Sequence, residues 1–70
     1  MIKRQSFLTK RERQIFRLLI QNQSTQDIAS NLGISEKTVR NHISNVIQKM
    51  NVKGRTQAII ELIKQNELDL

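Results

Sequence analysis

The chain has 70 residues and no cysteine, and it carries a net charge of +6 from 12 Lys and Arg against 6 Asp and Glu. This length allows one small domain with a modest core, and the lack of cysteine excludes a disulfide framework, a thiolate zinc site and a cysteine nucleophile. No apolar run approaches the roughly 20 residues of a membrane span, and no secretory leader follows Met1. We therefore expect a cytoplasmic protein that does not bind membranes.

Apolar residues make up 37% of the sequence and aromatic residues 3%, which favours an all-α domain over a β-rich one. An excess of positive charge on so small a body attracts polyanions at long range. Charge alone is equally compatible with a generically basic soluble protein, so the positions of the cations must decide.

The first helix is predicted over about residues 10–21. Thr9 and Glu12 have the T-x-x-E spacing of a capping box, in which each side chain binds a backbone N–H that the helix start leaves unpaired. Asn22 is suited to the end of this helix because Asn tolerates the left-handed backbone conformation of a C-cap. Apolar side chains mark one side of the helix: Ile15, Phe16, Leu18, Leu19 and Ile20. Polar side chains mark the other side: Lys10, Arg13, Gln14 and Arg17.

The second helix is predicted over about residues 25–32. Ser24 offers an N-cap, and Asp27 places a carboxylate in the first turn, where the helix dipole favours it. Gly33 can end the helix because glycine takes a positive φ without steric cost. The inner face is formed by three residues: Ile28, Ala29 and Leu32.

The third helix is predicted over about residues 36–50. Ser35 caps it only two residues after Gly33, so the two helices meet across a short turn in a helix-turn-helix arrangement. One stripe has the spacing of a buried face: Val39, Ile43, Val46, Ile47 and Met50. At about 100° per residue, the far side contains only polar side chains: Lys37, Arg40, Asn41, Ser44 and Gln48.

A loop at residues 51–54 precedes a fourth helix, predicted over about residues 56–66. Its core face has four apolar residues, Ala58, Ile59, Leu62 and Ile63, whereas Ile60 points elsewhere. The sequence shows no internal repeat and no interdomain linker. We therefore expect residues 1–70 to form a single helix-turn-helix domain.

The outer face of the third helix has the chemistry that a major groove requires. Arg40 can bond to guanine with two hydrogen bonds, Asn41 to adenine in the same way, and Ser44 to either base. Lys37, near the helix start, is better placed for a phosphate, as are residues on the flank: Thr38, His42, Asn45 and Lys49. A polar outer face is also what any surface helix shows, but here it follows a capped turn and has one carboxylate, Glu36, in the first turn.

His42 is the only histidine, and a single histidine without cysteine is a poor zinc ligand. Its position between the buried and outer faces fits either a phosphate contact or packing at the edge of the core. Nothing in the sequence places a serine beside it together with a carboxylate. We therefore predict no enzyme activity, no metal, no cofactor and no small-molecule substrate.

The sequence resembles the LuxR/GerE helix-turn-helix family along nearly its whole length. The resemblance lies in several blocks that follow one another in order: residues 8–13 (LTKRER), residues 27–29 (DIA), residues 34–43 (ISEKTVRNHI), Lys49 and Met50, Val52, and residues 55–58 (RTQA). Several spaced blocks make this resemblance more specific than a lone turn motif. The sequence departs from the family at Asn22, where many members have Gly, and at Thr25, where many have Asn.

The resemblance implies a four-helix DNA-binding transcription regulator with double-stranded DNA as its partner. It implies base contacts from Arg40, Asn41 and Ser44, backbone contacts from Lys37, Thr38, His42 and Lys49, and an approach of Glu12 to Lys49. It also implies a homodimer formed through the last helix, with an exposed strip of three residues: Ile60, Ile63 and Lys64. RNA polymerase is a further expected partner, and the nucleoid the expected location.

The sequence resembles one small free-standing member of the family more closely. The resemblance to that member continues through residues 52–55 to the tail, residues 66–70. That member regulates late sporulation genes in the mother cell, including spore coat genes. On this basis we expect activation of some promoters and repression of others.

Three alternatives remain open. The chain could be the output domain of a two-component response regulator, although a basic lead directly after Met1 favours a free-standing protein. It could be a helical adaptor that binds another protein, with a merely solvated basic face. The third alternative treats residues 10–20 as a cationic amphipathic membrane binder, but the apolar face of that helix is needed to close the core.

Overall fold

The protein was analysed as a computed structural model that describes residues 7–69. The basic lead at residues 1–6 and the last residue of the expected tail, Leu70, lie outside the described residues. Four helices follow one another: α1 (Lys10–Ile20), α2 (Thr25–Leu32), α3 (Glu36–Met50) and α4 (Arg55–Lys64). Residues 7–69 contain no strand, so the predicted all-α class is confirmed for this part of the chain.

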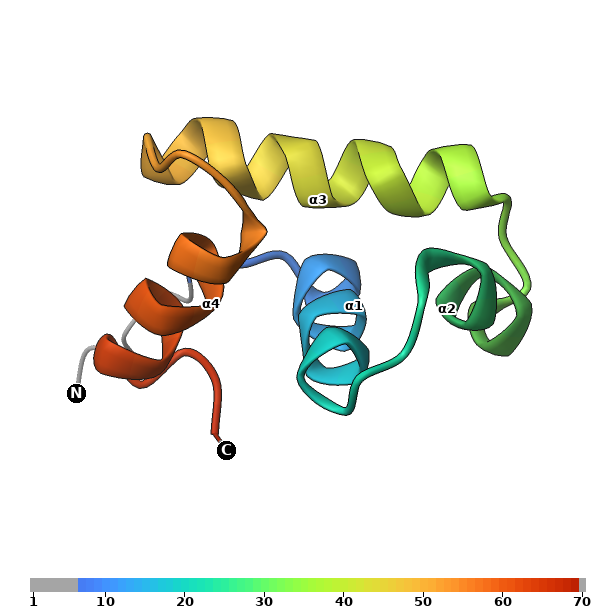
Figure 1. The fold of residues 1–70 in the computed structure, drawn as a ribbon, viewed down its shortest axis with the longest axis horizontal. Coiled ribbons are helices and arrows are strands. Elements are labelled where there is room, and N and C mark those ends of the chain that lie inside the picture. Colours follow the sequence, from blue (N-terminus) through green and yellow to red (C-terminus); the bar gives the residue numbers. More distant parts are fainter. Residues whose placement is uncertain (1–6, 70) are drawn as a thin grey trace, which may run out of the picture.

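The longest helix, α3, lies on one side of the molecule, and the other three helices lie on its opposite side (Figure 1). In that view α3 runs across the top, α2 lies beneath its first turns, and α4 lies beneath its last turns. One long face of α3 is therefore not covered by any other helix.

Short side chains bind the first backbone N–H groups of α1, α2 and α3. Thr9 and Glu12 form the predicted capping box, and Ser24 and Asp27 form a second one. Ser35 Oγ accepts the backbone N–H of Thr38 at 3.0 Å. These caps explain where the three helices begin, because each satisfies donors that would otherwise be unpaired. Helix α4 begins after Gly54 without a side-chain cap.

Residues with positive φ lie at or just beyond the ends of all four helices. Gly33 has φ +67° after α2, and Asn22 has φ +66° one residue after the cap of α1. Asn51 and Asn66 adopt the same conformation, with φ +56° and +60°. The chain reverses at Asn66, where the backbone N–H groups of the next two residues bond to the carbonyl of Leu62. Helix α4 therefore ends at Lys64, earlier than the expected residue 66.

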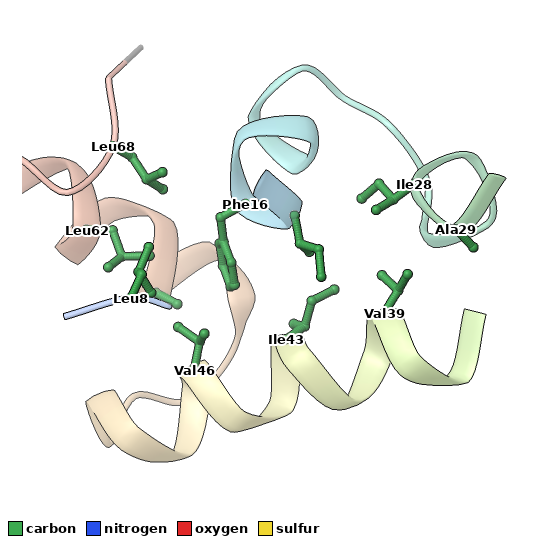
Figure 2. Packing of buried hydrophobic residues seen from close by; sticks show 11 residues of the cluster. Leu8, Phe16, Ile28, Ala29, Val39, Ile43, Val46, Leu62 and Leu68 are labelled. Carbon is green, nitrogen blue, oxygen red and sulfur yellow. The ribbon is translucent and has the colours of Figure 1, made fainter. Parts of the chain in front are cut away.

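The core lies between the inner face of α3 and the other three helices. Val39, Ile43 and Val46 project from α3 toward Phe16 and the α2 side chains (Figure 2). All of the apolar residues expected to face inward belong to this core or pack against it. Two further members come from outside the helices and were not foreseen: Leu8 and Leu68, 4% and 3% exposed.

Candidate nucleic-acid interface

The turn between α2 and α3 fixes the direction of α3. Gly33 ends α2 in the left-handed conformation, and the backbone N–H of Ile34 bonds to the carbonyl of Ala29 at 3.1 Å. The next residue, Ser35, already caps α3. With only three residues between the helices, α3 has little freedom to move relative to α2.

The outer face of α3 carries the three residues expected to contact bases. Arg40, Asn41 and Ser44 are all exposed, as is Lys37 one turn earlier. Val39 and Ile43, on the opposite face, are fully or almost fully buried. These four polar residues are therefore exposed on the side of α3 opposite its buried residues, and one long face of this helix is left uncovered by the other helices (Figure 1).

Arg40 is held by a carboxylate on its own helix. Its Nη2 atom donates to Glu36 Oε2 at 2.8 Å, and the same oxygen accepts the hydroxyl of Thr25, at the start of α2, at 2.7 Å. We call these three side chains the Thr25–Glu36–Arg40 network. The spacing of Glu36 and Arg40 suits an i,i+4 ion pair, so this part could have been foreseen. The link to Thr25 crosses the turn and has no local signal.

The residues expected on the flank differ in their availability. Thr38 is half-buried and its hydroxyl shares a hydrogen bond of 2.8 Å with Ser35. His42 is half-buried too, which fits its place between the two faces. Lys49 is occupied within the fold, because its Nζ donates to Glu12 Oε1 at 2.8 Å and lies 5.3 Å from the centre of the Phe7 ring.

The pair of Glu12 and Lys49 joins α1 to the last turn of α3. The Glu12 side chain is 5% exposed and that of Lys49 33%. Burial raises the pKa of Glu12, but hydrogen bonds from Lys49 and Thr9 and the positive charge of Lys49 outweigh it, so this pKa lies below its ordinary value. The approach of Glu12 to Lys49 that the resemblance implied is present.

A second buried carboxylate was missed by the sequence reasoning. Glu67 is 8% exposed, and its Oε1 forms an ion pair with Arg13 Nη2 at 2.9 Å. Arg13 also donates to the backbone carbonyl of Glu67, and the backbone N–H of Phe7 donates to Glu67 Oε2 at 3.3 Å. Arg13 was expected on the solvated side of its helix, whereas it holds the tail after α4 against α1.

The residues expected at a dimer interface lie on α4, apart from the outer face of α3 (Figure 1). Ile60 is 48% exposed, and among residues 7–69 only one other large apolar residue, Phe7, is exposed, at 37%. Ile63 was expected in the exposed strip, but it is half-buried because it packs against the core. Lys64 is exposed, and its Nζ lies 3.9 Å from Glu61 Oε2.

Within residues 7–69, no three His, Asp or Glu side chains are grouped so that they could hold a metal ion. No helix in this part of the chain is both long enough and apolar enough to cross a bilayer.

The sequence is similar to those of known bacterial regulatory proteins. The sequence profile of the family described as bacterial regulatory proteins, luxR family, matches residues 6–62. The spore germination protein GerE of Bacillus subtilis is 64% identical over 63 residues, which cover 90% of this chain and 85% of that protein. The transcriptional regulatory protein DegU of Brevibacillus brevis is 53% identical over 57 residues, but the match covers only 24% of DegU.

Solved structures give the same result. A structure of the transcription factor GerE superposes with a TM-score of 0.91 and 62% identity, covering 93% of this chain and 97% of that one. The response regulator ChrA of a heme-sensing two-component system superposes with a TM-score of 0.82 and 35% identity, over 94% of this chain and 33% of ChrA.

Proposed function

The chain belongs to the luxR family of bacterial regulatory proteins, and on this premise we propose that it regulates transcription by binding specific DNA sequences with α3. The observation that carries the proposal is the outer face of α3, on which Arg40, Asn41 and Ser44 are all exposed and opposite to the buried residues of the helix. An α-helix fits the major groove, and these side-chain types match the donors and acceptors on base edges.

Around these base contacts, we assign phosphate contacts to Lys37, Thr38 and His42, which are next to the same face. We also assign a phosphate contact to Lys49. Its Nζ donates to Glu12 in the free protein, so it either donates to both groups or replaces Glu12 with the phosphate when DNA binds. The net charge of +6 supports attraction to DNA as a whole.

The biological setting of the proposal comes from the similarity to the B. subtilis protein named for spore germination. We assign this chain to the control of sporulation genes in the cytoplasm, at the nucleoid. Activation of some promoters through RNA polymerase and repression of others belong to the same proposal. Transcription of reporter promoters with purified polymerase, with and without the protein, tests this part directly.

We further assign homodimer formation to α4. Ile60, Ile63 and Lys64 have i, i+3, i+4 spacing and therefore share one face of this helix, and Ile60 is exposed there. A symmetric dimer would place two copies of α3 on inverted half-sites about one DNA turn apart.

The experiment that tests the function is selection of bound duplexes from a random pool at near-physiological salt. Enrichment of two inverted half-sites about one turn apart is the expected result. A folded protein that enriches no sequence would contradict the proposal and favour the adaptor alternative.

The salt dependence of binding to the enriched duplex separates these two functions further. Each phosphate contact releases counterions and makes the slope of log affinity against log salt more negative by about 0.9, so affinity should fall steeply as salt rises. A flat dependence would favour a contact between apolar helix faces instead.

A further inference from the structure

The Thr25–Glu36–Arg40 network contains a residue that has no place in the proposed contact surface. Thr25 is the first residue of α2 and is half-buried. It donates to the carboxylate oxygen that also accepts Arg40. The network thus runs from the helix before the turn to a side chain that we assign to base contact.

Arg40 needs a restraint if it is to distinguish bases. Its side chain is 59% exposed, and a free arginine side chain has rotamer entropy worth about 2 kcal/mol, part of which is lost on binding. The bond to Glu36 uses Nη2. Because a guanidinium has five N–H donors, enough remain for a bidentate contact with guanine.

Glu36 by itself restrains Arg40 only weakly. Its side chain is 38% exposed, and exposed i,i+4 ion pairs contribute only about 0.3–0.5 kcal/mol. The hydroxyl of Thr25 changes this, because it is carried by a β-branched side chain with few rotamers and binds the carboxylate at 2.7 Å. Thr25 therefore fixes Glu36 from a separate helix.

We propose that Thr25 is a positioning residue that sets the base preference of Arg40 through Glu36. This inference rests on the proposed function. The carboxylate of Glu36 lies beside the surface assigned to DNA, where it repels phosphates. Glu36 thus lowers the affinity for all sequences and at the same time raises the discrimination at the one base pair that Arg40 contacts.

Substitutions of the other two members of the network, Thr25 and Glu36, are therefore expected to differ in their effect on DNA binding. Thr25→Val keeps the shape and the net charge but removes the donor, so affinity for unrelated DNA should stay the same while base preference falls. Glu36→Gln removes a negative charge, so affinity for unrelated DNA should rise while base preference falls. A purely structural role for either residue would lower the melting temperature and weaken binding to all sequences alike.

The test uses the full chain and the enriched duplex with each of the four base pairs at every position. The position of Arg40 is the one at which Arg40→Ala removes the preference. There, Thr25→Val should lower the preference about 2- to 10-fold, the range of a single hydrogen bond, and Thr25→Ser, which keeps the hydroxyl but not the β-branch, should retain most of it. Ser30→Ala, which removes another hydroxyl from α2 outside the network, is the matched control and should change nothing.

Two further readouts identify the route through Arg40. In the Arg40→Ala background, Thr25→Val should have no additional effect on the base preference at this position. In the free protein, Thr25→Val should increase the mobility of the Arg40 side chain, measured by NMR relaxation at its Nε. An effect that persists without Arg40, or an unchanged mobility, would overturn the inference.

The outcomes separate the two proposals. A wild-type protein without any base preference overturns the proposed function and this inference with it. A wild-type preference that Thr25→Val leaves intact overturns the inference alone.

Discussion

Glu12 shows how one side chain can serve two parts of the fold. It completes the cap of α1 by accepting the backbone N–H of Thr9 at 3.0 Å, and it accepts Lys49 from the end of α3 with the same oxygen. A carboxylate buried to this degree is costly unless such donors surround it. The ionised form is therefore the one that the folded protein favours, and its pKa is lowered.

This lowered pKa makes stability depend on pH. The contribution of ionised Glu12 is fully present above its ordinary pKa of 4.5 and is lost as the pH falls through the lower folded value. Glu12→Gln should cost about 1–2 kcal/mol at neutral pH, and the difference from wild type should shrink below the ordinary pKa. Urea unfolding of both proteins across the acidic range measures this; a difference that stays constant with pH would contradict it.

Arg40 and Lys37 should differ in what their loss does to DNA binding. Arg40→Ala should cost about 1–3 kcal/mol at one base pair and relax the preference there, because it removes the base contact that we propose for this side chain. Lys37→Ala should weaken binding to all sequences alike, because phosphates carry no sequence information. Titration of matched and mismatched duplexes tests both. Equal preference in wild type and Arg40→Ala would remove Arg40 from the base contacts.

At the scale of the elements, caps and turns could be predicted because their signals are local. Thr9 with Glu12 indicates where α1 begins, and Asn22 takes the expected left-handed conformation. The period of the apolar residues likewise indicated which face of α3 is buried, and hence which face is exposed.

Contacts between distant segments could not be predicted in this way. Glu67 and Leu68 follow the last helix in a polar stretch, and no periodicity marks them as buried. Their burial depends on the reversal at Asn66 and on Arg13, which lies more than 50 residues earlier in the chain. The bond between Thr25 and Glu36 is hidden for the same reason, because it forms only once the turn has set α2 against α3.

The tail after α4 should therefore contribute measurably to stability. Leu68 is 3% exposed, and truncating a buried leucine costs about 2–5 kcal/mol. We expect Leu68→Ala to fall at the low end of this range, because a chain end can relax around the cavity. Asp69→Ala, at an exposed neighbour, is the control and should change little. Equal unfolding midpoints for the two variants in urea would show that the tail does not support the core.

At the scale of the whole molecule, the proposed dimer interface on α4 can be tested at Ile60. Ile60→Glu should leave the protomer folded, because Ile60 is 48% exposed, but should weaken binding to paired half-sites by opposing dimer formation. Gln26→Glu makes the same change of charge at an exposed position on α2 and should have no such effect. Sedimentation and titration of paired and single half-sites test this. Unchanged sedimentation and affinity would remove Ile60 from the interface.

The contacts of Glu67 also bear on the order in which the molecule assembles. Its carboxylate accepts the backbone N–H of Phe7, 60 residues away, and Arg13, 54 residues away. In contrast, the caps of α1, α2 and α3 each join residues only three apart. Closing a long loop costs more conformational entropy than closing a short one, so we infer that the capped helices form early in folding and that the tail docks late. On this order of events, the two ends of the described chain meet only after the exposed face of α3 has already taken shape.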